Sequence, residues 1–480
     1  MIADLKPYPA YKDSGVPWLG KVPEHWEVLP NRALFSEVKE RDHPDDQMLS
    51  VTITKGVIRQ RALLAWSSKK DSSNQDKSAY KLVCLGDIAY NKMRAWQGAI
   101  GVSDLRGIVS PAYVVVRQRK DCDSRYFHHL FRTPQFAKEA ERWSYGITSD
   151  MWSLRPEHFR MIYCSLPPRD EQSAIVRFLD YADRRIQRYI LAKQKLIKLL
   201  EEQKQVIIHH AVTRGPNPNV RLKPSGVEWL GDVPEHWEVW QIGHFSRVGN
   251  GSTPSRGNSA YWSGGYYPWL NSAYANQESV TQSDQFVTDT ALRECHLPIV
   301  PPGSVLVAIT GQGKTRGKAT VLRIEATINQ HMAFITPKAK IASAEYLRLA
   351  LHGSYAQLRS ISDDSGSTKG ALTCADLKHF RLILPPPPEQ NEILAAVENE
   401  TCACSAAINR AHREIALLRE YRTRLIADAV TGKLDVREAA AKLPEETDVP
   451  ESLDDAEALA EGDEESEDVD LDAVPEEAGA

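Results

Sequence analysis

The sequence predicts an α+β protein built from two tandem units, each a mixed α/β region that ends in a long helix. The first observation is a duplicated opening, because SGVPWLGKVPEHWEV at 14–28 returns as SGVEWLGDVPEHWEV at 225–239. Two later motifs return in the same order, LPPRDEQ (166–172) as LPPPPEQ (384–390) and AVTRG (211–215) as AVTGK (429–433). Motifs that recur in order at a nearly constant offset indicate duplicated structural units.

Size and cysteine content agree with this organisation. A chain of 480 residues has room for roughly two to four domains, each with its own core. The seven cysteines (84, 122, 164, 295, 374, 402 and 404) are an odd number without a CxxC pair, which favours a reducing compartment over a disulfide framework or a zinc ribbon. We find neither a secretion signal nor a run of about 18 apolar residues, so we expect a soluble, cytoplasmic protein.

Charge is divided unevenly along the chain. Residues 443–480 contain 17 Asp and Glu and no Lys or Arg, so the rest of the chain carries a net charge of +12 against −5 for the whole. A basic body is expected of a surface that neutralises phosphates. The tail cannot bury enough apolar surface to fold alone, and we expect it to be disordered; an autoinhibitory mimic of phosphate is the alternative.

The mixed regions contain short β-rich runs and short helical stretches between Gly, Pro, Asn and Ser clusters. The helical stretches lie at 124–143 and 343–361. The expected strands are MLSVTIT (48–54), DIAYNKM (87–93), AYVVVRQ (112–118), SVLVAIT (304–310) and HMAFITP (331–337).

The long closing helices follow a heptad step, with prolines just before them and Gly215 or Gly432 just after. A mean step of about 3.5 residues is typical of a coiled-coil seam, and two amphipathic helices buried in one globule are the alternative. The expected first seam is Ile175, Leu179, Ala182, Ile186, Tyr189, Lys193, Leu196, Leu200, Gln203 and Ile207. The expected second seam, with Arg422 intruding, is Val397, Cys404, Ile408, Ala411, Ile415, Leu418, Leu425 and Ala429.

Loops of both mixed regions combine amides, hydroxyls, basic residues and aromatics, the mixture that reads base edges and positions phosphates. Each loop alone is weak evidence, but together on a basic body they favour nucleic acid as the ligand. The candidate DNA-binding residues are Lys69, Lys70, Asn91, Lys92, Arg94, Trp96, Gln97, Ser144, Tyr145, Thr148, Thr253, Arg256, Asn258, Tyr261, Gln312, Lys314, Arg316, Lys318, Asn329, Gln330, Ser367, Thr368 and Lys369.

Catalytic chemistry is weakly indicated at best. The segment AITGQGKT (308–315) fits a relaxed phosphate-loop pattern, but such a loop must lead directly into a helix. Here it leads into RGKATVLRI (316–324), which is β-like, and the equivalent loop NKMRAWQG (91–98) lacks the pattern. His25 and His236, inside the repeated PEHW, are interpreted as parts of a packing or docking element rather than an acid–base pair. We predict no catalytic residue and no metal site in this chain.

Taken together, the GVxWLGxVPEHWEV opening, the PPxxEQ helix entry and the helix exit with AVT and glycine (AVTRG and AVTGK), all present twice, closely resemble the DNA-specificity subunit of type I restriction–modification systems. The resemblance covers residues 14 to about 440, and the acidic tail lies outside it. It implies that each mixed region is a target-recognition domain reading one half of a bipartite, asymmetric sequence. It also implies that the helices pack as an antiparallel coiled coil, set the spacer and dock two methyltransferase subunits.

Catalysis would then belong to partners: S-adenosylmethionine to the methyltransferase subunits, and ATP and Mg to restriction/translocase subunits, with no cofactor in this chain. The resemblance predicts recognition domains at 1–168 and 215–388 and helices at 169–214 and 389–433. The composition, not the resemblance, predicts a disordered acidic tail at 434–480. A coiled-coil scaffold whose loops bind protein is the alternative from another class, and a phosphate-loop ATPase is the less favoured one.

Overall fold

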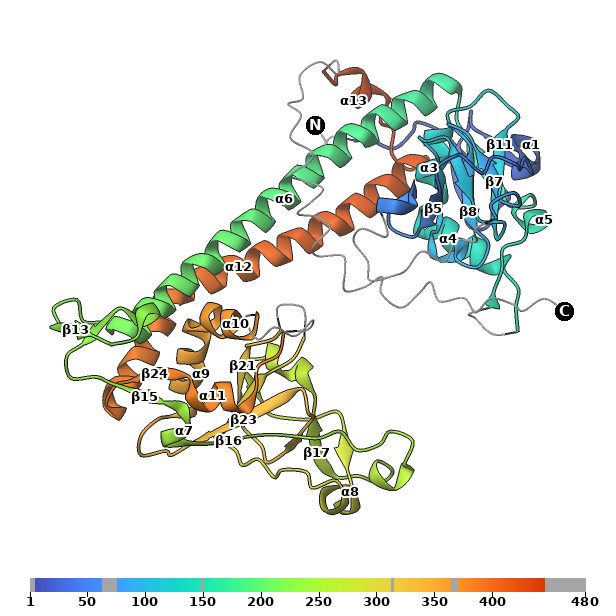
Figure 1. The fold of residues 1–480 in the computed structure, drawn as a ribbon. Helices are drawn as coiled ribbons and strands as arrows, with labels where there is room; N and C mark the ends of the chain where they lie inside the picture. The colour runs from blue at the N-terminus through green and yellow to red at the C-terminus, as the bar shows by residue number, and fades with distance from the viewer. Residues whose placement is uncertain (1–4, 63–75, 148–150, 312–314, 364–369, 445–480) are drawn as a thin grey trace. The chain divides into compact units, whose positions relative to one another are not determined.

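The computed structural model describes residues 5–62, 76–147, 151–311, 315–363 and 370–444 (Figure 1). They form two compact units. The first unit comprises the chain up to Gln194 together with the chain from His412 onward, and the second comprises Lys195–Ala411. None of the helices in the described part of the chain combines the length and the apolar composition that crossing a bilayer requires.

The first unit is built around a four-stranded antiparallel sheet with the order β4-β11-β8-β9. Its strands are β4 (Phe35–Val38), β8 (Ile88–Asn91), β9 (Ile100–Val102) and β11 (Tyr113–Gln118). Four antiparallel pairs surround it: β1 (Tyr11–Asp13) with β2 (Lys21–Pro23), β3 (Glu27–Pro30) with β12 (Tyr163–Leu166), β5 (Leu49–Thr52) with β6 (Gly56–Arg59), and β7 (Lys81–Val83) with β10 (Gly107–Val109). Its shorter helices are α1 (Asn31–Leu34), η2 (Ala95–Gln97), α3 (Ser124–Phe131), α4 (Pro134–Arg142) and α5 (Pro156–Phe159).

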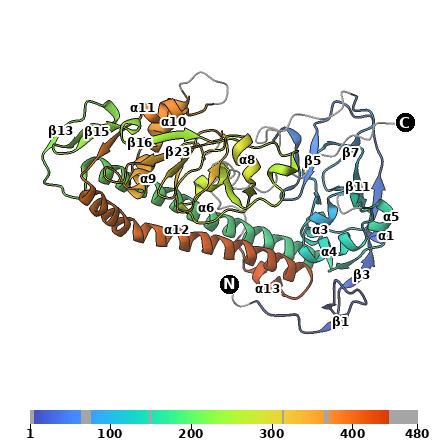
Figure 2. The same ribbon diagram turned by 90° about the horizontal axis from the view of Figure 1, so that it is seen from below.

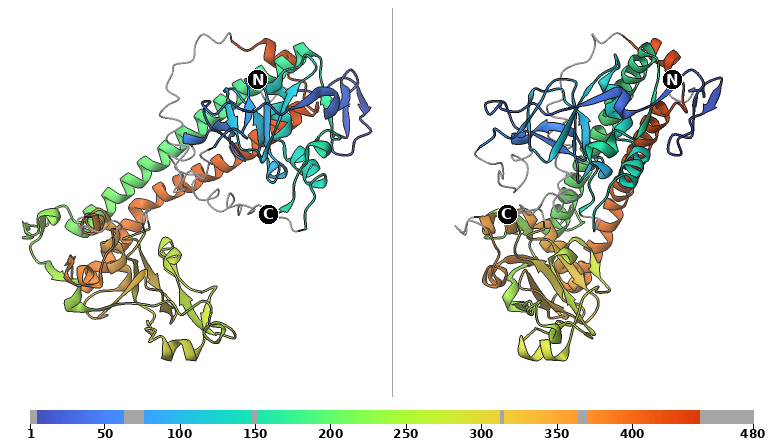
Figure 3. Two further views of the ribbon diagram at one scale, coloured as in Figure 1. Left: turned by 45° about the vertical axis from the view of Figure 1, so that its right-hand side comes forward. Right: turned by 90° about the vertical axis from the view of Figure 1, so that its right-hand side faces the viewer.

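The second unit, coloured from green to orange in Figure 3, contains a five-stranded sheet. Its order is β16-β23-β20-β21-β18, and among these described strands only β18 and β21 are parallel. The strands are β16 (Ser246–Asn250), β18 (Ser279–Val280), β20 (Val305–Ala308), β21 (Ala319–Leu322) and β23 (Met332–Pro337). A second sheet has the order β19-β17-β22 and consists of β17 (Tyr267–Leu270), β19 (Phe286–Val287) and β22 (Thr327–Ile328). Two antiparallel pairs are formed by β13 (Leu222–Pro224) with β14 (Asp232–Pro234) and by β15 (Glu238–Gln241) with β24 (Arg381–Leu384). The helices are η4 (Glu228–Leu230), α7 (Ile242–Phe245), η5 (Ser259–Tyr261), η6 (Ser272–Asn276), α8 (Asp289–Glu294), α9 (Ala344–Gly353), α10 (Tyr355–Asp363) and α11 (Cys374–His379).

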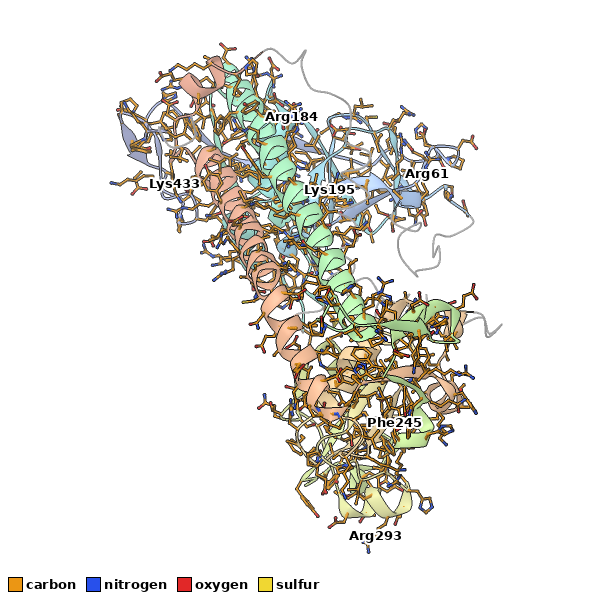
Figure 4. The ribbon with its side chains drawn as sticks, turned by 90° about the vertical axis from the view of Figure 1, so that its left-hand side faces the viewer. Arg61, Arg184, Lys195, Phe245, Arg293 and Lys433 are labelled. Carbon is orange, nitrogen blue, oxygen red and sulfur yellow. The ribbon has the colours of Figure 1, made fainter. Side chains whose placement is uncertain are left out.

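Each unit has its own apolar core, as the separate hydrophobic patterns require. The first core is aromatic, with Phe127, Phe131 and Phe136 fully buried among the strands and helices. The second is mainly aliphatic and includes Phe245, which Figure 4 labels within the second unit. Burial of a large apolar side chain contributes roughly 1.5–3 kcal/mol, so each unit has the means to hold its own loops in place.

The expected strands are confirmed as β5, β8, β11, β20 and β23. The two expected helical stretches are each broken in two. At Thr133 the side chain accepts the N–H of Phe136 and begins a new helix with Pro134 at its first position. In the second unit the break follows Gly353, where α9 ends and α10 begins at Tyr355.

The duplicated motifs meet in equivalent places. The strand after each PEHW pairs with the strand before each PPxxEQ, with Val28 opposite Ser165 in the first unit and Val239 opposite Ile383 in the second. These pairings bring each PEHW beside the start of a long helix. The repeat in the sequence is therefore a repeat of tertiary packing.

A glutamate at the start of each long helix holds the repeated His-Trp pair. In α6 (Arg169–Arg214), Glu171 Oε1 accepts the indole N–H of Trp26 at 2.8 Å, and Oε2 lies 2.8 Å from His25 Nε2. In α12 (Pro387–Val430), Glu389 accepts the indole N–H of the second tryptophan at 2.8 Å and contacts the second histidine at 2.9 Å. Interpreting PEHW as a packing element is confirmed, since Trp26 and Trp237 are 0% and 2% exposed.

The glutamine after each glutamate fixes the start of a helix in the preceding mixed region. Gln172 Oε1 accepts the backbone N–H of Asp123, the N-cap of α3, at 2.7 Å. Gln390 Oε1 accepts the backbone N–H of Ser343, the N-cap of α9, at 3.0 Å. The EQ of each PPxxEQ motif thus ties a long helix to the domain it leaves.

The glycine after each long helix packs against a repeated tryptophan. Gly215, after α6, has φ of +74° and lies against Trp237, so α6 begins in the first unit and ends in the second. Gly432, after α12, has φ of +78° and lies against Pro23 and Trp26, so α12 runs the other way between units. Glycine is favoured at both exits because the left-handed backbone strains other residues.

The two long helices pack antiparallel, as expected (Figure 2). In the first unit Arg422 forms an ion pair with Asp183, and Lys193 Nζ lies 2.6 Å from Glu414 Oε2, so the numbering falls along α12 as it rises along α6. The pair with Asp183 also accounts for the arginine that interrupts the second seam. A packed antiparallel pair with a shared seam is the geometry of a coiled coil.

The predicted first seam is correct up to Ile186 and only partly correct beyond it. Lys193, Leu200 and Ile207 are half-buried, but the other three predicted positions are exposed. Tyr189 and Leu196 are 52% and 41% exposed, whereas the adjacent Ile190 and Ile197 are buried. A straight helix with 3.6 residues per turn drifts about 20° per heptad against a strict heptad step, so the buried stripe moves to the next residue. The predicted second seam is half-buried or buried at each of its positions.

The tail begins later than residue 434. Residues 433–444 pack on the first unit, where the Asp435 N–H donates to the Lys6 carbonyl at 2.8 Å and Val436 is fully buried. The short helix α13 (Arg437–Ala441) follows, and Arg177 donates to the Leu443 carbonyl at 3.0 Å. Apolar Leu434, Val436 and Leu443 explain the correction, because the acidic composition starts only after them. Residues 445–480 lie outside the described residues.

Candidate nucleic-acid interface

In the first unit the candidate loop between β8 and β9 is shaped by its own side chains. Asn91 Oδ1 accepts the N–H of Met93 at 3.1 Å, and the indole N–H of Trp96 donates to the Met93 carbonyl at 2.9 Å. Arg94 Nη1 donates to Gln97 Oε1 at 3.1 Å. These residues are half-buried, as is Lys92. The loop therefore presents amide, basic and aromatic groups from a folded turn.

Arg132, a residue that sequence reasoning missed, supports this loop through hydrogen bonds to backbone carbonyls. Its guanidinium donates to the carbonyls of Gly98 at 3.3 Å, Ile100 at 3.1 Å and Ile53 at 2.9 Å, and also to that of Thr54. Burial lowers the pKa of the Arg132 side chain to about 10, which still leaves it charged at neutral pH. Charge-assisted hydrogen bonds of this kind join the β5–β6 turn to the candidate loop.

A second segment of the first unit adjoins that loop. The Leu154 N–H donates to the Lys92 carbonyl at 2.8 Å, and Trp152 meets Trp96 edge to face with ring centroids 5.7 Å apart. Tyr145 is 57% exposed in the same segment. The structure thus brings Tyr145 and the 91–98 loop into one region.

In the second unit the segment after β16 crosses close to β22. The Ser252 N–H donates to the Ile328 carbonyl at 3.0 Å, and a side chain at Gly251 would collide with that carbonyl. Asn258 then caps η5 by accepting the N–H of Ala260 at 3.1 Å. Close approach of two backbones is a specific reason for glycine at 251.

Polar side chains link the candidate loops of the second unit. Thr253 donates to Gln330 Oε1, and Gln330 Nε2 lies 3.2 Å from His331 Nε2. His331 Nδ1 lies 2.8 Å from Thr310 Oγ1, at the start of the loop between β20 and β21. Three loops far apart in the sequence therefore form one polar surface.

Two further candidates have partners beside this surface. Lys318 Nζ donates to Asn276 Oδ1 at 3.0 Å, and Tyr261 donates to Glu294 Oε2 at 3.0 Å. The hydrogen bond to Glu294 raises the pKa of the Tyr261 phenol, so Tyr261 stays a neutral hydroxyl. Both side chains are half-buried and positioned by neighbours.

Three candidates are buried in this structure rather than exposed at its surface. Arg316 is 3% exposed and donates to the Gly370 carbonyl, Asn329 is 5% exposed and accepts the His331 N–H, and Ser144 is 7% exposed and donates to the Ala140 carbonyl. Each completes a local backbone hydrogen bond instead of facing solvent, which polarity alone could not reveal. Outside the described residues lie Lys69, Lys70, Thr148, Gln312, Lys314, Ser367, Thr368 and Lys369.

The described residues give little support to nucleotide binding, reactive thiols or a metal site. The chain after the GQGKT segment forms strand β21 rather than the helix that a phosphate loop requires. Burial raises the pKa of Cys122 to about 11 and raises that of Cys164 as well, so these two thiols are protonated at neutral pH. Within the described ranges, no group of three or more His, Cys, Asp or Glu is placed to hold a metal ion.

The fold and its loops define a class of protein with two equivalent α/β units, each presenting a different polar surface, joined by antiparallel helices. Comparisons with known proteins agree. Residues 234–410 match the family model of the type I restriction modification DNA specificity domain. The type I restriction enzyme MjaIX specificity subunit of Methanocaldococcus jannaschii is 33% identical over 168 residues, which cover 34% of this chain and 38% of that relative.

The match thus spans little more than a third of the MjaIX relative's length. A putative type I restriction enzyme MjaX specificity subunit of the same organism is 20% identical over 439 residues, covering 87% of this chain and 96% of the relative. A solved chain from work on complex assembly and conformational transition of the type I R-M system has the same fold, with a TM-score of 0.60 and 18% identity over 86% of this chain and 99% of that one. The family match and the named relatives together support a DNA-specificity subunit of a type I restriction–modification system.

Proposed function

We propose that this chain reads a bipartite, asymmetric DNA sequence, with each unit contacting one half through the loops described above. The observation that supports this proposal is that both units keep the same Glu, Gln, Trp and Gly anchors, while their exposed loops differ in sequence and in hydrogen-bond partners. A duplicated scaffold with divergent loops is suited to reading two different half-sites.

Chemistry in this proposal belongs to partner subunits, and this chain is not itself an enzyme. Two methyltransferase subunits would carry S-adenosylmethionine, and restriction/translocase subunits would use ATP and Mg. Support for docking on the helices comes from large apolar side chains that stay exposed on them. These are Tyr189 at 52%, Leu199 at 54% and Val206 at 68% on α6, with Leu417 at 64% and Tyr421 at 39% on α12. Exposed apolar groups on a helix pair are typical of a surface that a partner covers.

The proposal is tested by producing the chain with a methyltransferase partner in a host without adenine methylation and mapping methylated adenines genome-wide. We expect a two-part motif with a fixed gap that disappears when this chain is omitted. A scaffold that binds protein would leave methylation independent of the chain. That result, or an uninterrupted motif, would contradict the proposal.

The helices are proposed to set the gap between the half-sites. Removing seven residues from α6 within 187–193 together with 413–419 of α12 shortens the pair by about 10 Å, at about 1.5 Å per residue. We expect the gap in the methylated motif to shorten by about three base pairs, at roughly 3.4 Å per base pair, with both half-sites unchanged. A gap of the original length with altered half-site bases would contradict the ruler.

A further inference from the structure

Arg256 lies on the segment after β16, and its guanidinium packs against two aromatic rings. Its Cζ lies 3.9 Å from the ring centroid of Trp262 and 4.9 Å from that of Trp269. Its Nη2 donates to Gln285 Oε1 at 2.7 Å. The side chain nevertheless remains exposed.

The partners of Arg256 are themselves fixed. The Trp262 indole N–H donates to the Ser255 carbonyl at 3.1 Å, and that of Trp269 donates to the Ser252 carbonyl at 3.2 Å. The two rings meet edge to face, with centroids 5.3 Å apart and an interplanar angle of 83°. Trp269 is only 3% exposed. The cradle is thus built from both strand and loop.

This arrangement orders the side chain of Arg256 without neutralising its charge. Within the described part of the second unit, its partners are two indoles and an amide, so no carboxylate there neutralises its charge. A free arginine loses up to about 2 kcal/mol of side-chain entropy when it is ordered, and here much of that freedom is already lost. A preorganised cation of this kind binds an incoming acceptor with a smaller entropic cost.

We propose that Arg256 donates two N–H groups to a paired acceptor on DNA, and that Trp262 is the positioning residue that orients it. Guanidinium has five N–H donors in a planar fork, and the described contacts use one of them. Phosphate oxygens and the N7/O6 edge of guanine are both acceptors that match this fork. The inference rests on the proposed function, because it assumes that the second unit meets DNA.

The test uses the full chain with its methyltransferase partner and two duplexes, one carrying the mapped motif and one with both halves scrambled. Arg256→Lys keeps the charge and removes the fork. Arg293→Lys, at an exposed arginine on α8 that Figure 4 labels, is the matched control. We expect Arg256→Lys to bind the motif at least about fivefold more weakly and the control to bind like the parent chain.

A guanine edge and a phosphate group, the two acceptors that fit the fork, predict different effects on binding to the two duplexes. If Arg256 meets guanine, only motif binding weakens. If it meets phosphate, binding to both duplexes weakens alike, and Arg256→Ala lowers the slope of log affinity against log salt by about one. Parent-like binding of Arg256→Lys to both duplexes overturns the proposal. Failure of the proposed function is distinct, because the unmodified chain would then show no preference for the motif.

Trp262 needs a test that separates positioning from folding. Trp262→Phe keeps a ring beneath the guanidinium, whereas Trp262→Leu removes it. We expect Trp262→Leu to weaken binding about threefold and Trp262→Phe to restore most of it, with hydrogen exchange of 267–287 unchanged in both. Equal binding by the two variants, or loss of binding only together with loss of protection at 267–287, would overturn the positioning role.

Discussion

In the first unit the candidate loop after β8 rests on the buried guanidinium of Arg132, whereas in the second unit the segment after β16 rests on Gly251 and on two tryptophans. The joints at the start of the two long helices are nevertheless the same, since Glu171 and Glu389 each bind a His-Trp pair. Duplication preserved the joints between domain and helix, whereas the candidate loops of the two units lie at different places in the sheet and have different supports. Loops with independent supports can change their ligand without disturbing the joints.

The joints differ in burial, and that difference gives the largest expected effect. Glu171 is 5% exposed and also accepts from Tyr8, whereas the Glu389 side chain is 33% exposed. We expect Glu171→Ala to lower the free energy of unfolding of the first unit by about 4 kcal/mol, since it leaves buried donors without an acceptor. The matched Glu389→Ala is expected to cost the second unit about 1–2 kcal/mol.

Hydrogen exchange read separately for peptides of 88–116 and 305–337 measures both units in one chain. Each variant should lose protection mainly in its own unit. Equal losses by the two variants would show that burial of the joint does not set its contribution.

A smaller effect should appear with pH in the first unit. His128 lies against Gly101, its Nδ1 accepts the Val102 N–H at 3.3 Å, and burial, followed by the nearby charges of His129 and Arg132, lowers its pKa well below the usual value. Below about pH 6.5 the imidazole of His128 takes up a proton in the unfolded chain, whereas in the folded unit it is protonated only at a much lower pH. Stability is therefore complete above that pH and falls as pH falls below it, by at most about 1.4 kcal/mol per pH unit.

The variant His128→Asn keeps an acceptor but does not titrate. We expect it to flatten the dependence of first-unit hydrogen exchange on pH between about 6.5 and 4.5, with the second unit unaffected. A first unit whose stability has the same pH dependence in the variant would assign the effect to other groups.

The sequence predicted the scaffold better than the candidate interface, for physical reasons visible at particular residues. The repeats located the joints, but Glu171 and Trp26 lie far apart in the chain, so their hydrogen bond followed only from tertiary structure. After Ile186 the first seam was only partly predicted, because Ile190 and Ile197 stand next to predicted positions and a strict heptad step does not distinguish adjacent apolar residues. The long strands and the ends of both helices were set by local pattern and were predicted closely.

The candidate interface was harder to predict from the sequence, because a polar residue can contact a ligand only where the fold leaves it exposed. Arg316 reads as a phosphate contact in the sequence, yet it is buried and donates to the Gly370 carbonyl. Arg132 gave no signal because it bonds backbone carbonyls, which any residue supplies. Arg256 was named as a contact, but its aromatic cradle depends on Trp269 from another strand.

The account is tested most directly by asking whether the two halves of the target can be altered separately. One variant changes Lys92 and Gln97 to Ala in the first unit, and the other changes Thr253 and Gln330 to Ala in the second. Genome-wide mapping of methylated adenines should show bases relaxed or lost in one half for the first variant and in the other half for the second, with the same gap. A change in both halves, or in the gap, caused by either variant alone would contradict the assignment of one half-site to each unit.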